Sequence, residues 1–302
     1  MKNETPRKLA NIRAAIYGKP WAITLDGLRQ ITAIAEAHVD GRSIEYLAVT
    51  AKKPSDDEED ESEDSGMSFE DEYGFSYDSL TDVAVVPIFG PIFPHANLMT
   101  KYSGATSLDD TMNRIKDASG LNPSGIILNI DSPGGSVEGL TAFCSALALM
   151  TQRSGGSCPI IALANDLCAS AAYMIASQCD SVYGVEGAMV GSIGTVMQMD
   201  NYDRAERNSG NDPILIRSHE LKGIGYGSVT PSQMDDLART VDLYFGKFKQ
   251  AVSSGRPQVD LTKTATGQVW MVSPASGDTS AQELNLVDGV STLDDLIESL
   301  KK

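Results

Sequence analysis

One serine stands where an apolar, strand-like run gives way to small residues that suit the start of a helix. The run is 159–164, Asn165 or Asp166 is available to cap the first turn of the helix, and Ser170 follows. A serine at a strand-to-helix turn has its hydroxyl near the positive end of the helix and backbone N–H groups pointing into free space, which suits attack on a carbonyl. Ser170 is therefore a candidate nucleophile. The structural alternative is a small residue that lets a helix pack closely on a sheet.

Two adjacent glycines follow a second buried strand, 125–130, in the run Asp131-Ser132-Pro133-Gly134-Gly135-Ser136. Without a Cβ, Gly134 and Gly135 let the backbone turn sharply and bring its N–H groups close to a ligand. Together with the N–H of Ala171, directly after the candidate nucleophile, they form a candidate oxyanion hole. The alternative is that the Pro-Gly-Gly sequence is only a turn.

A serine hydroxyl needs a base, and the histidines do not supply an obvious one. No spacing supports a Ser-His-Asp triad for any of the three, His38, His95 and His219. A lysine does the same work when burial lowers its pKa toward neutrality. Lys222 is the candidate, in a glycine-rich loop after a strand predicted at 214–217, and its alternative is an exposed loop lysine. Cys168, two residues before Ser170, is a less favoured nucleophile.

Composition and charge exclude several classes of protein. A chain of 302 residues with 41% hydrophobic content has room for one large α/β domain or two small ones. No run approaches the roughly 18–20 apolar residues of a membrane span and the polar start has no signal region, so a soluble, cytoplasmic protein is expected. The net charge of −17 argues against nucleic-acid binding by a basic face. The chain lacks metal-ligand spacing among its four cysteines and lacks GxGxxG and P-loop motifs, so neither metal nor cofactor is predicted.

The chain divides into three parts by composition. Residues 1–52 are expected to be a small, mainly helical segment, and 53–79 a disordered acidic linker, in which residues 56–72 hold eleven of the 41 acidic residues. Residues 80–302 alternate apolar strand-like runs with helical patterns, which predicts an α/β fold with a mainly parallel sheet. Strands are expected at 83–89, 125–130, 159–164, 181–185, 190–199 and 214–217, and helices at 107–118, 137–151, from 170, and 231–253.

Five motifs occur in an order that resembles the signal peptide peptidase A family of serine peptidases, in the Clp/crotonase superfamily. They are Val85-Val86-Pro87-Ile88-Phe89-Gly90, Asp131 to Val137, Ser170 among small residues, Gly191-Ser192-Ile193-Gly194-Thr195, and Lys222. The serine stands 52 residues before the lysine, as in that family. Within it the chain is more similar to the head-maturation (prohead) proteases of tailed phages, which share Tyr102-Ser103-Gly104, Ala162 to Asp166 and Ser218-His219. The resemblance covers about residues 80 to 300.

The resemblance implies a Clp/crotonase-like domain of repeated ββα units and a Ser/Lys dyad without metal or cofactor. Ser170 would be the nucleophile and Lys222 the general base, with oxyanion N–H groups from Gly134 or Gly135 and Ala171. Protein substrates would bind as an added strand beside the glycines and beside Gly191, Ser192, Ile193 and Gly194. Family members form oligomers in which active sites can be completed across subunits. Asn285 departs from the glycine usual in the family's terminal Gly-Leu-Val-Asp, and Met271 to Ser280 resembles an insertion.

The expected function is a serine endopeptidase that cleaves capsid, scaffold or portal proteins during phage head maturation. It would act in the cytoplasm of the bacterial host or within the viral prohead, as a homo-oligomer, without nucleic acid or membrane. Three alternatives remain: a catalytically inactive minor head protein of the same fold, a general cytoplasmic signal-peptide-peptidase-like protease, and a crotonase-type acyl-CoA enzyme. The absence of an N-terminal hydrophobic segment argues against clearance of signal peptides.

Overall fold

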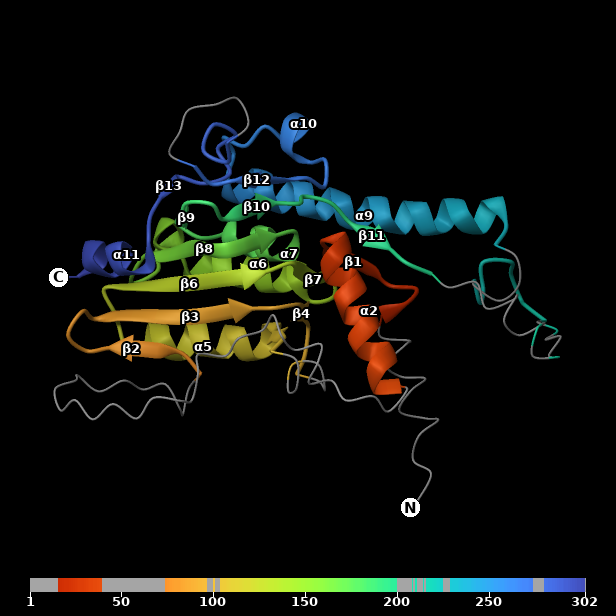
Figure 1. The fold of residues 1–302 in the computed structure, drawn as a ribbon, viewed down its shortest axis with the longest axis horizontal. Helices are drawn as coiled ribbons and strands as arrows, with labels where there is room; N and C mark the ends of the chain where they lie inside the picture. The colour runs from red at the N-terminus through yellow and green to blue at the C-terminus, as the bar shows by residue number, and fades with distance from the viewer. Residues whose placement is uncertain are drawn as a thin grey trace, which may run out of the picture.

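A computed structural model describes most of the chain outside the acidic stretch. The described residues are 16–39, 74–96, 100, 104–199, 208, 210, 214, 216–224, 229–273 and 280–301. They form two β-sheets packed with helices (Figure 1). The part of the predicted linker up to residue 73 lies outside them. In the part that the structure describes, no helix is both long and apolar enough to span a membrane.

The large sheet carries the core of the domain. Its main path runs β12-β10-β8-β6-β3-β2, and β9 joins it beside β8 and is itself paired with β13. The strands are β2 (Ser76–Asp78), β3 (Val83–Phe89), β6 (Gly125–Ser132), β8 (Ile160–Ala169), β9 (Ser181–Gly184), β10 (Met189–Gly191), β12 (Val269–Met271) and β13 (Gly289–Val290). Neighbours from β3 to β10 run parallel, and β2 and β12 pair antiparallel at the two ends. The first halves of the central strands, such as 125–128 in β6 and 160–164 in β8, are continuously apolar and buried because helices cover both faces.

A second, smaller sheet lies across the carboxyl ends of the large-sheet strands and has the order β11-β1-β7-β4-β5. Its strands are β1 (Pro20–Ile23), β4 (Ile92–Phe93), β5 (Thr106–Ser107), β7 (Gly134–Ser136) and β11 (Val196–Met197). The chain visits a large-sheet strand, the small sheet and a helix in turn, first as β3-β4-β5-α5 and again as β6-β7-α6. This repetition of strands followed by a helix confirms the predicted α/β class.

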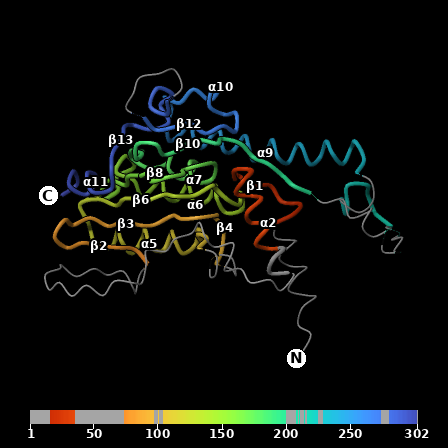
Figure 2. The backbone as a smooth tube through the Cα atoms, in the orientation of Figure 1, coloured from red at the N-terminus to blue at the C-terminus, as the bar shows by residue number. Residues whose placement is uncertain are grey.

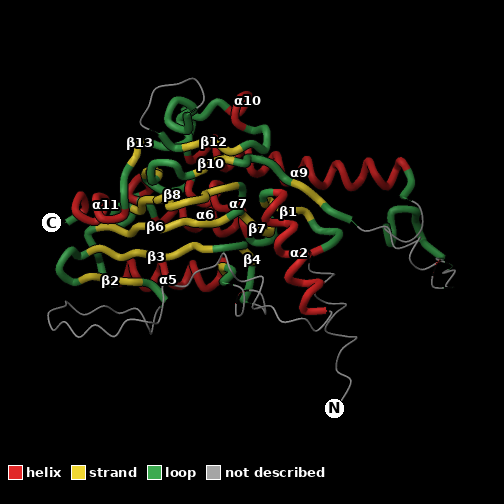
Figure 3. The backbone as a smooth tube through the Cα atoms, in the orientation of Figure 1, coloured by secondary structure: helices red, strands yellow, loops and turns green. Residues whose placement is uncertain are grey.

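Helices cover both faces of the large sheet (Figure 3). The α-helices of the described residues are α2 (Leu25–Val39), which packs in a separate cluster with β1, α5 (Leu108–Gly120), α6 (Leu140–Met150), α7 (Ala171–Ala176), α9 (Pro231–Gly255), α10 (Leu261–Thr264) and α11 (Leu293–Leu300). Alternate residues of β3, β6 and β8, such as Val86, Leu128 and Ala162, join the main core with α5, α6, α7 and α9. The intervening residues, such as Ile127, face α11 in a smaller cluster. The helices predicted at 107–118, 137–151 and 231–253 are confirmed, with ends shifted by up to three residues.

Four expectations differ from the structure. Ile214, Ile216 and Arg217 are not in a strand, so the strand predicted at 214–217 is wrong for its described residues. The strand predicted at 190–199 is two short strands, because Gly191 and Ser192 have φ angles of 117° and 52° that break an extended run. The third difference is β1, a strand from the segment expected to be mainly helical, which pairs with two strands of the main domain. In addition, β2 falls inside the stretch predicted as linker.

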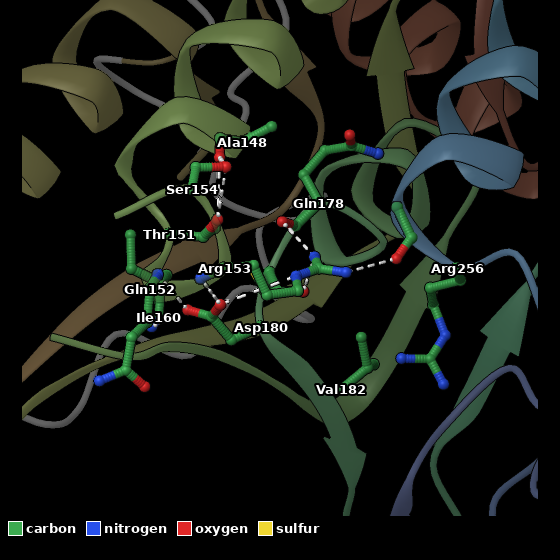
Figure 4. A network of polar contacts seen from close by, with 12 residues as sticks. Ala148, Thr151, Gln152, Arg153, Ser154, Ile160, Gln178, Asp180, Val182 and Arg256 are labelled. Atoms are coloured by element: carbon green, nitrogen blue, oxygen red, sulfur yellow. Dashed lines mark hydrogen bonds and ion pairs between the residues drawn. The ribbon is translucent and has the colours of Figure 1, made fainter. Parts of the chain in front are cut away.

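A partly exposed network of polar contacts holds the C-terminal end of α9 (Figure 4). The guanidinium of Arg153 donates to the carbonyls of Gly255 (2.7 Å), Gln178 (3.0 Å) and Cys179 (2.5 Å). The carboxylate of Asp180 accepts from three backbone N–H groups, those of residues 152, 153 and 160. These bonds satisfy carbonyls and N–H groups at chain turns that burial would otherwise leave unpaired. The long helix α9 is thereby anchored at its C-terminal end.

Candidate active site

Ser170 occupies the one-residue turn between β8 and α7. Its φ and ψ angles are 56° and −116°, a combination that is strained for any residue with a Cβ. The strain is maintained by hydrogen bonds on both sides: Ser170 N–H donates to Gly191 O (2.7 Å), and Ser170 O accepts from Met174 N–H (2.9 Å), the first bond of α7. Ser170 is also fully buried. A strained, buried serine at a strand-to-helix turn is the kind of backbone outlier that clusters at active sites.

The two glycines predicted for the oxyanion hole lie directly beside Ser170. Since β6 and β8 are neighbours in the large sheet, Ser132 and Cys168 pair near their carboxyl ends, and β7 follows β6 at once. Gly134 has a φ of 99°, and a Cβ placed on it would lie 2.9 Å from Ser170 Cβ and 2.3 Å from Ala22 O. On Gly135 a Cβ would lie 2.0 Å from Ile92 O. Both positions therefore admit only glycine in this packing.

The segment Gly191 to Gly194 borders the serine on the other side. Ser170 Oγ donates to Gly194 O at 3.4 Å, and Ser192 N–H donates to Gln268 O at 2.5 Å. The side chain of Ile193 is fully buried in the main core. Of the four residues predicted to bind substrate, Ile193 therefore has only its backbone available for a peptide.

Lys222 is not brought together with these residues. It is exposed in a turn in which its N–H donates to His219 O (3.0 Å), and the turn is held to the start of α9 by Gln233 Nε2, which donates to Glu220 O (2.5 Å). Residues 216–224 lie beyond the N-terminal end of α9, drawn in teal far from β8 and α7 (Figure 2). Within the described part of this one chain, Lys222 makes no contact with Ser170.

The thiol of Cys168 is poorly suited to act as the nucleophile. It is fully buried, and burial raises the pKa of the Cys168 thiol far above its ordinary value, with the neighbouring Cys179 adding to the effect. The nucleophilic form of cysteine is the thiolate, which such burial disfavours. The geometry therefore favours Ser170 over Cys168.

Sequence reasoning missed one segment at this site, the strand β1. Ala22 pairs with Gly135, and the carbonyl of Ala22 is the closest atom to the space where a Gly134 side chain would be. The available signal was the run Pro20-Trp21-Ala22-Ile23, a small residue between two large apolar ones. An alternation this short predicts no strand without the partner strands to which it is paired.

Replacing Gly134 by alanine is expected to abolish cleavage, because the backbone beside Ser170 must move to admit a Cβ. The new Cβ would approach the Ser170 side chain and displace the N–H groups of the candidate oxyanion hole, so we expect cleavage of a protein substrate to fall at least about 100-fold. Gly187→Ala is the matched control: Gly187 has a similar φ of 90°, but a Cβ placed on it would have no atom within 4 Å. It should lose about 1 kcal/mol of stability from backbone strain and keep its activity. Equal cleavage rates for Gly134→Ala and Gly187→Ala would contradict the assignment of Gly134 to the active site.

Comparison with known proteins shows what the chain is related to. Residues 153–302 match the model described as peptidase family S49. The chain is 28% identical over 231 residues to capsid assembly protease C of Escherichia phage lambda, which covers 75% of this chain and 52% of the relative. It is 31% identical over 180 residues to the probable protease SohB of Haemophilus influenzae (59% and 48%) and 27% identical over 180 residues to the head-tail preconnector protein GP5 of Enterobacteria phage P21 (59% and 35%). The chain thus spans about half or less of the length of these relatives.

A solved structure of a membrane-bound stomatin-specific protease with a substrate peptide is also similar to the chain. The two are 16% identical, with a TM-score of 0.37 over 71% of this chain and 77% of that one. A likeness of this size is too low for the two sites to be compared.

Proposed function

We propose that the protein is a serine endopeptidase with Ser170 as nucleophile and Lys222 as general base, starting from the match of residues 153–302 to the model of peptidase family S49. One observation carries the proposal: a buried serine is held at a strained strand-to-helix turn against two obligatory glycines. Strain of this kind costs about 1–3 kcal/mol and persists where a site needs a fixed geometry.

The chemistry follows from the groups around the serine. Ser170 Oγ attacks the peptide carbonyl and passes its proton to the amine of Lys222. The N–H groups of Gly134 or Gly135 and of Ala171 stabilise the negative charge that forms on the carbonyl oxygen. The lysine then gives the proton to the leaving amine, and water hydrolyses the acyl-enzyme by the same route. No metal or cofactor is needed for these steps.

We assign Lys222 to the site of a neighbouring copy of the chain. Gln233, which holds the turn of Lys222, precedes Val241 by eight residues, and Val241 is the residue of α9 whose carbonyl accepts from Thr195 Oγ1 (2.9 Å). Eight helical residues span about 12 Å, so the turn lies more than two helical turns from the point where α9 meets the site. Ile214 and Ile216, 89% and 93% exposed, precede the lysine and suit burial against another copy.

The substrates we propose are capsid, scaffold or portal proteins during phage head assembly, in the host cytoplasm or in the prohead. Support comes from the relatives named for capsid assembly in phage lambda and for the head-tail preconnector of phage P21. A general protease is the second candidate, favoured by the similarity to the probable protease SohB. An inactive structural head protein is the remaining alternative.

The test is intact-mass analysis of a purified capsid or scaffold protein after incubation with the wild type and with Ser170→Ala. The wild type should cut, and the variant should be slower by about a thousandfold or more, because a nucleophile acts as a unit with its base. A disordered test protein in a parallel reaction separates the two candidates: a general protease cuts it as readily as the head proteins. Unchanged masses with the assembled wild type would favour the inactive structural protein.

A further inference from the structure

The strand β1 occupies an interior position of the small sheet, between β7 and β11. Trp21, Ala22 and Ile23 pair with Ser136, Gly135 and Gly134, and Pro20 and Trp21 pair with Met197 and Val196, antiparallel in both cases. Neighbouring strands lie about 4.8 Å apart, so without β1 a gap one strand wide would separate β7 from β11. The two exposed edges would be the glycine strand and the strand that follows Gly191 to Gly194. An extended peptide fills such a gap by strand addition.

The register places the carbonyl of Ala22 at the serine. Thr24 N–H donates to Pro133 O at 2.9 Å, and with Ile23 opposite Gly134 the antiparallel ladder pairs Gly135 N–H with Ala22 O. The same carbonyl oxygen and Ser170 Cβ lie 2.3 and 2.9 Å from the position of a Cβ on Gly134. Ala22 O is therefore held by a candidate oxyanion donor, next to the candidate nucleophile.

The side chain of Ala22 fits a small apolar pocket. The pocket has a remaining volume of only about 10 Å³, and it is lined by Val137, Leu140, Met174, Thr195 and Phe248 among others. Ala22 is the one residue of β1 that belongs to the main core, whereas Trp21 and Ile23 point the other way. A side chain larger than a few carbon atoms would not enter this pocket without moving its walls.

The unit that carries β1 has a core of its own. Ile16, Trp21, Ile23, Leu28, Ile31 and Ala35 pack together. From the main domain Phe93 joins their buried cluster, with Trp21 and Phe93 edge to face at 5.7 Å, and the partly buried Ala105 and Val196 pack against it. A unit that satisfies most of its apolar surface internally can leave the domain without unfolding it. While it is in place, Ser170 is fully buried and no peptide can reach it.

We propose that β1 is a built-in occupant of the peptide-binding position, with Ala22 in the place of the substrate residue whose carbonyl Ser170 attacks. The proposal rests on the proposed function for the identity of the site. It has two consequences. Substrates bind only after β1 is displaced, and the residue on the amino side of the cut bond is small, as Ala22 is.

A reversible lock on β1 tests the first consequence in the full chain. Lys19 directly precedes β1 and Glu138 lies two residues beyond β7, and their side chains are joined by an ion pair of 3.0 Å. Cysteines at these two positions are therefore within reach of a short dithiol linker that bridges them by disulfides. The double variant Lys19→Cys/Glu138→Cys should fix β1 when oxidised with this linker and release it when reduced. The four native cysteines are buried and free, so oxidised wild type is the matched control.

Binding of a fluorescent peptide Pro-Trp-Ala-Ile-Thr, followed by anisotropy, reports on the site independently of catalysis. The reduced double variant should bind it at least tenfold more tightly than the oxidised one, and the peptide with Trp in place of Ala should not bind. Cleavage of a protein substrate should fall at least tenfold on oxidation and return on reduction. Equal peptide binding in the two states, or equal binding of the Ala and Trp peptides, would overturn the inference. If the peptide binds more tightly to the reduced variant but no variant cleaves the protein substrate, the inference about β1 holds and the proposed peptidase activity is wrong.

Discussion

Mixing Ser170→Ala chains with Lys222→Ala chains is expected to restore cleavage that neither variant has alone. Each variant removes one half of the dyad. If the base comes from a neighbouring copy, an intact serine on a Lys222→Ala chain can meet an intact lysine on a Ser170→Ala chain. In a random 1:1 assembly about a quarter of the sites would be complete. A dyad formed within one chain would give no restoration at all.

The measurement is the initial rate of substrate cleavage after the two purified variants have been allowed to exchange subunits. A mixture of Lys222→Ala with the double variant Ser170→Ala/Lys222→Ala is the negative control, because it contains no intact lysine. Lys263→Ala controls for the loss of a positive charge, since Lys263 is exposed and paired only loosely with Asp260 (3.9 Å). It should cleave at the wild-type rate. A mixture as inactive as its components would contradict the assignment of Lys222 to a neighbouring site.

Removal of the Arg256 side chain is expected to lower the free energy of unfolding by about 3–5 kcal/mol, since it leaves the Asn285 carbonyl without this donor and the Asp288 carboxylate with only the N–H of Val182. Arg256 is only 3% exposed, and its guanidinium makes two bonds of 2.8 Å to Asp288 and two to Asn285 O. Arg256→Ala should show this loss in denaturant titration. Arg239→Ala is the control, because Arg239 and Asp236 form an exposed pair worth under about 1 kcal/mol. Equal losses in the two variants would contradict the structural role of Arg256.

The pair of Arg256 and Asp288 also makes the loss of stability in Arg256→Ala depend on pH. Burial on its own raises the pKa of Asp288, but hydrogen bonds from Arg256 and from Val182 N–H outweigh it and hold that pKa below its usual value. A carboxyl with a lowered folded-state pKa stabilises the protein above its unfolded pKa, about 4, and loses that contribution as the pH falls through the folded value. The difference in stability between wild type and Arg256→Ala should therefore shrink below about pH 4. A difference that stays constant down to pH 2 would mean that Asp288 is not the partner that matters.

The adjacency of Ser170 and the two glycines was predictable from the sequence. Each follows a buried parallel strand, and the carboxyl ends of parallel neighbours meet at one edge of a sheet. Asn285 was expected to depart from the glycine that the resemblance implies at this position. Its φ of 57° lies in the left-handed region, which asparagine tolerates better than most residues with a side chain. Its carbonyl is also the acceptor for Arg256.

Two features of the site depend on tertiary contacts that local pattern does not encode. The four residues of β1 form a strand only because β7 and β11 offer two edges, so a helical interpretation of the N-terminal segment missed them. Ile214 and Ile216 have the β-branched composition of a buried strand, yet the structure leaves both exposed outside any strand. Apolar residues indicate that a segment is buried, but they do not say whether it is buried in its own chain or against another copy.

The long helix α9 has a consequence for the time course of the reaction. It is fixed to the sheet near Phe248 and Val252, while Met234 and Leu243, nearer its start, are 56% and 64% exposed. If the base reaches the active site of another copy from the start of this helix, only the associated chains are active. The specific activity then rises with the protein concentration and is lost on dilution. Newly made chains scattered through a cell would then be idle. A closed assembly raises the local concentration of the chains, so proteolysis would begin once the chains are enclosed in it.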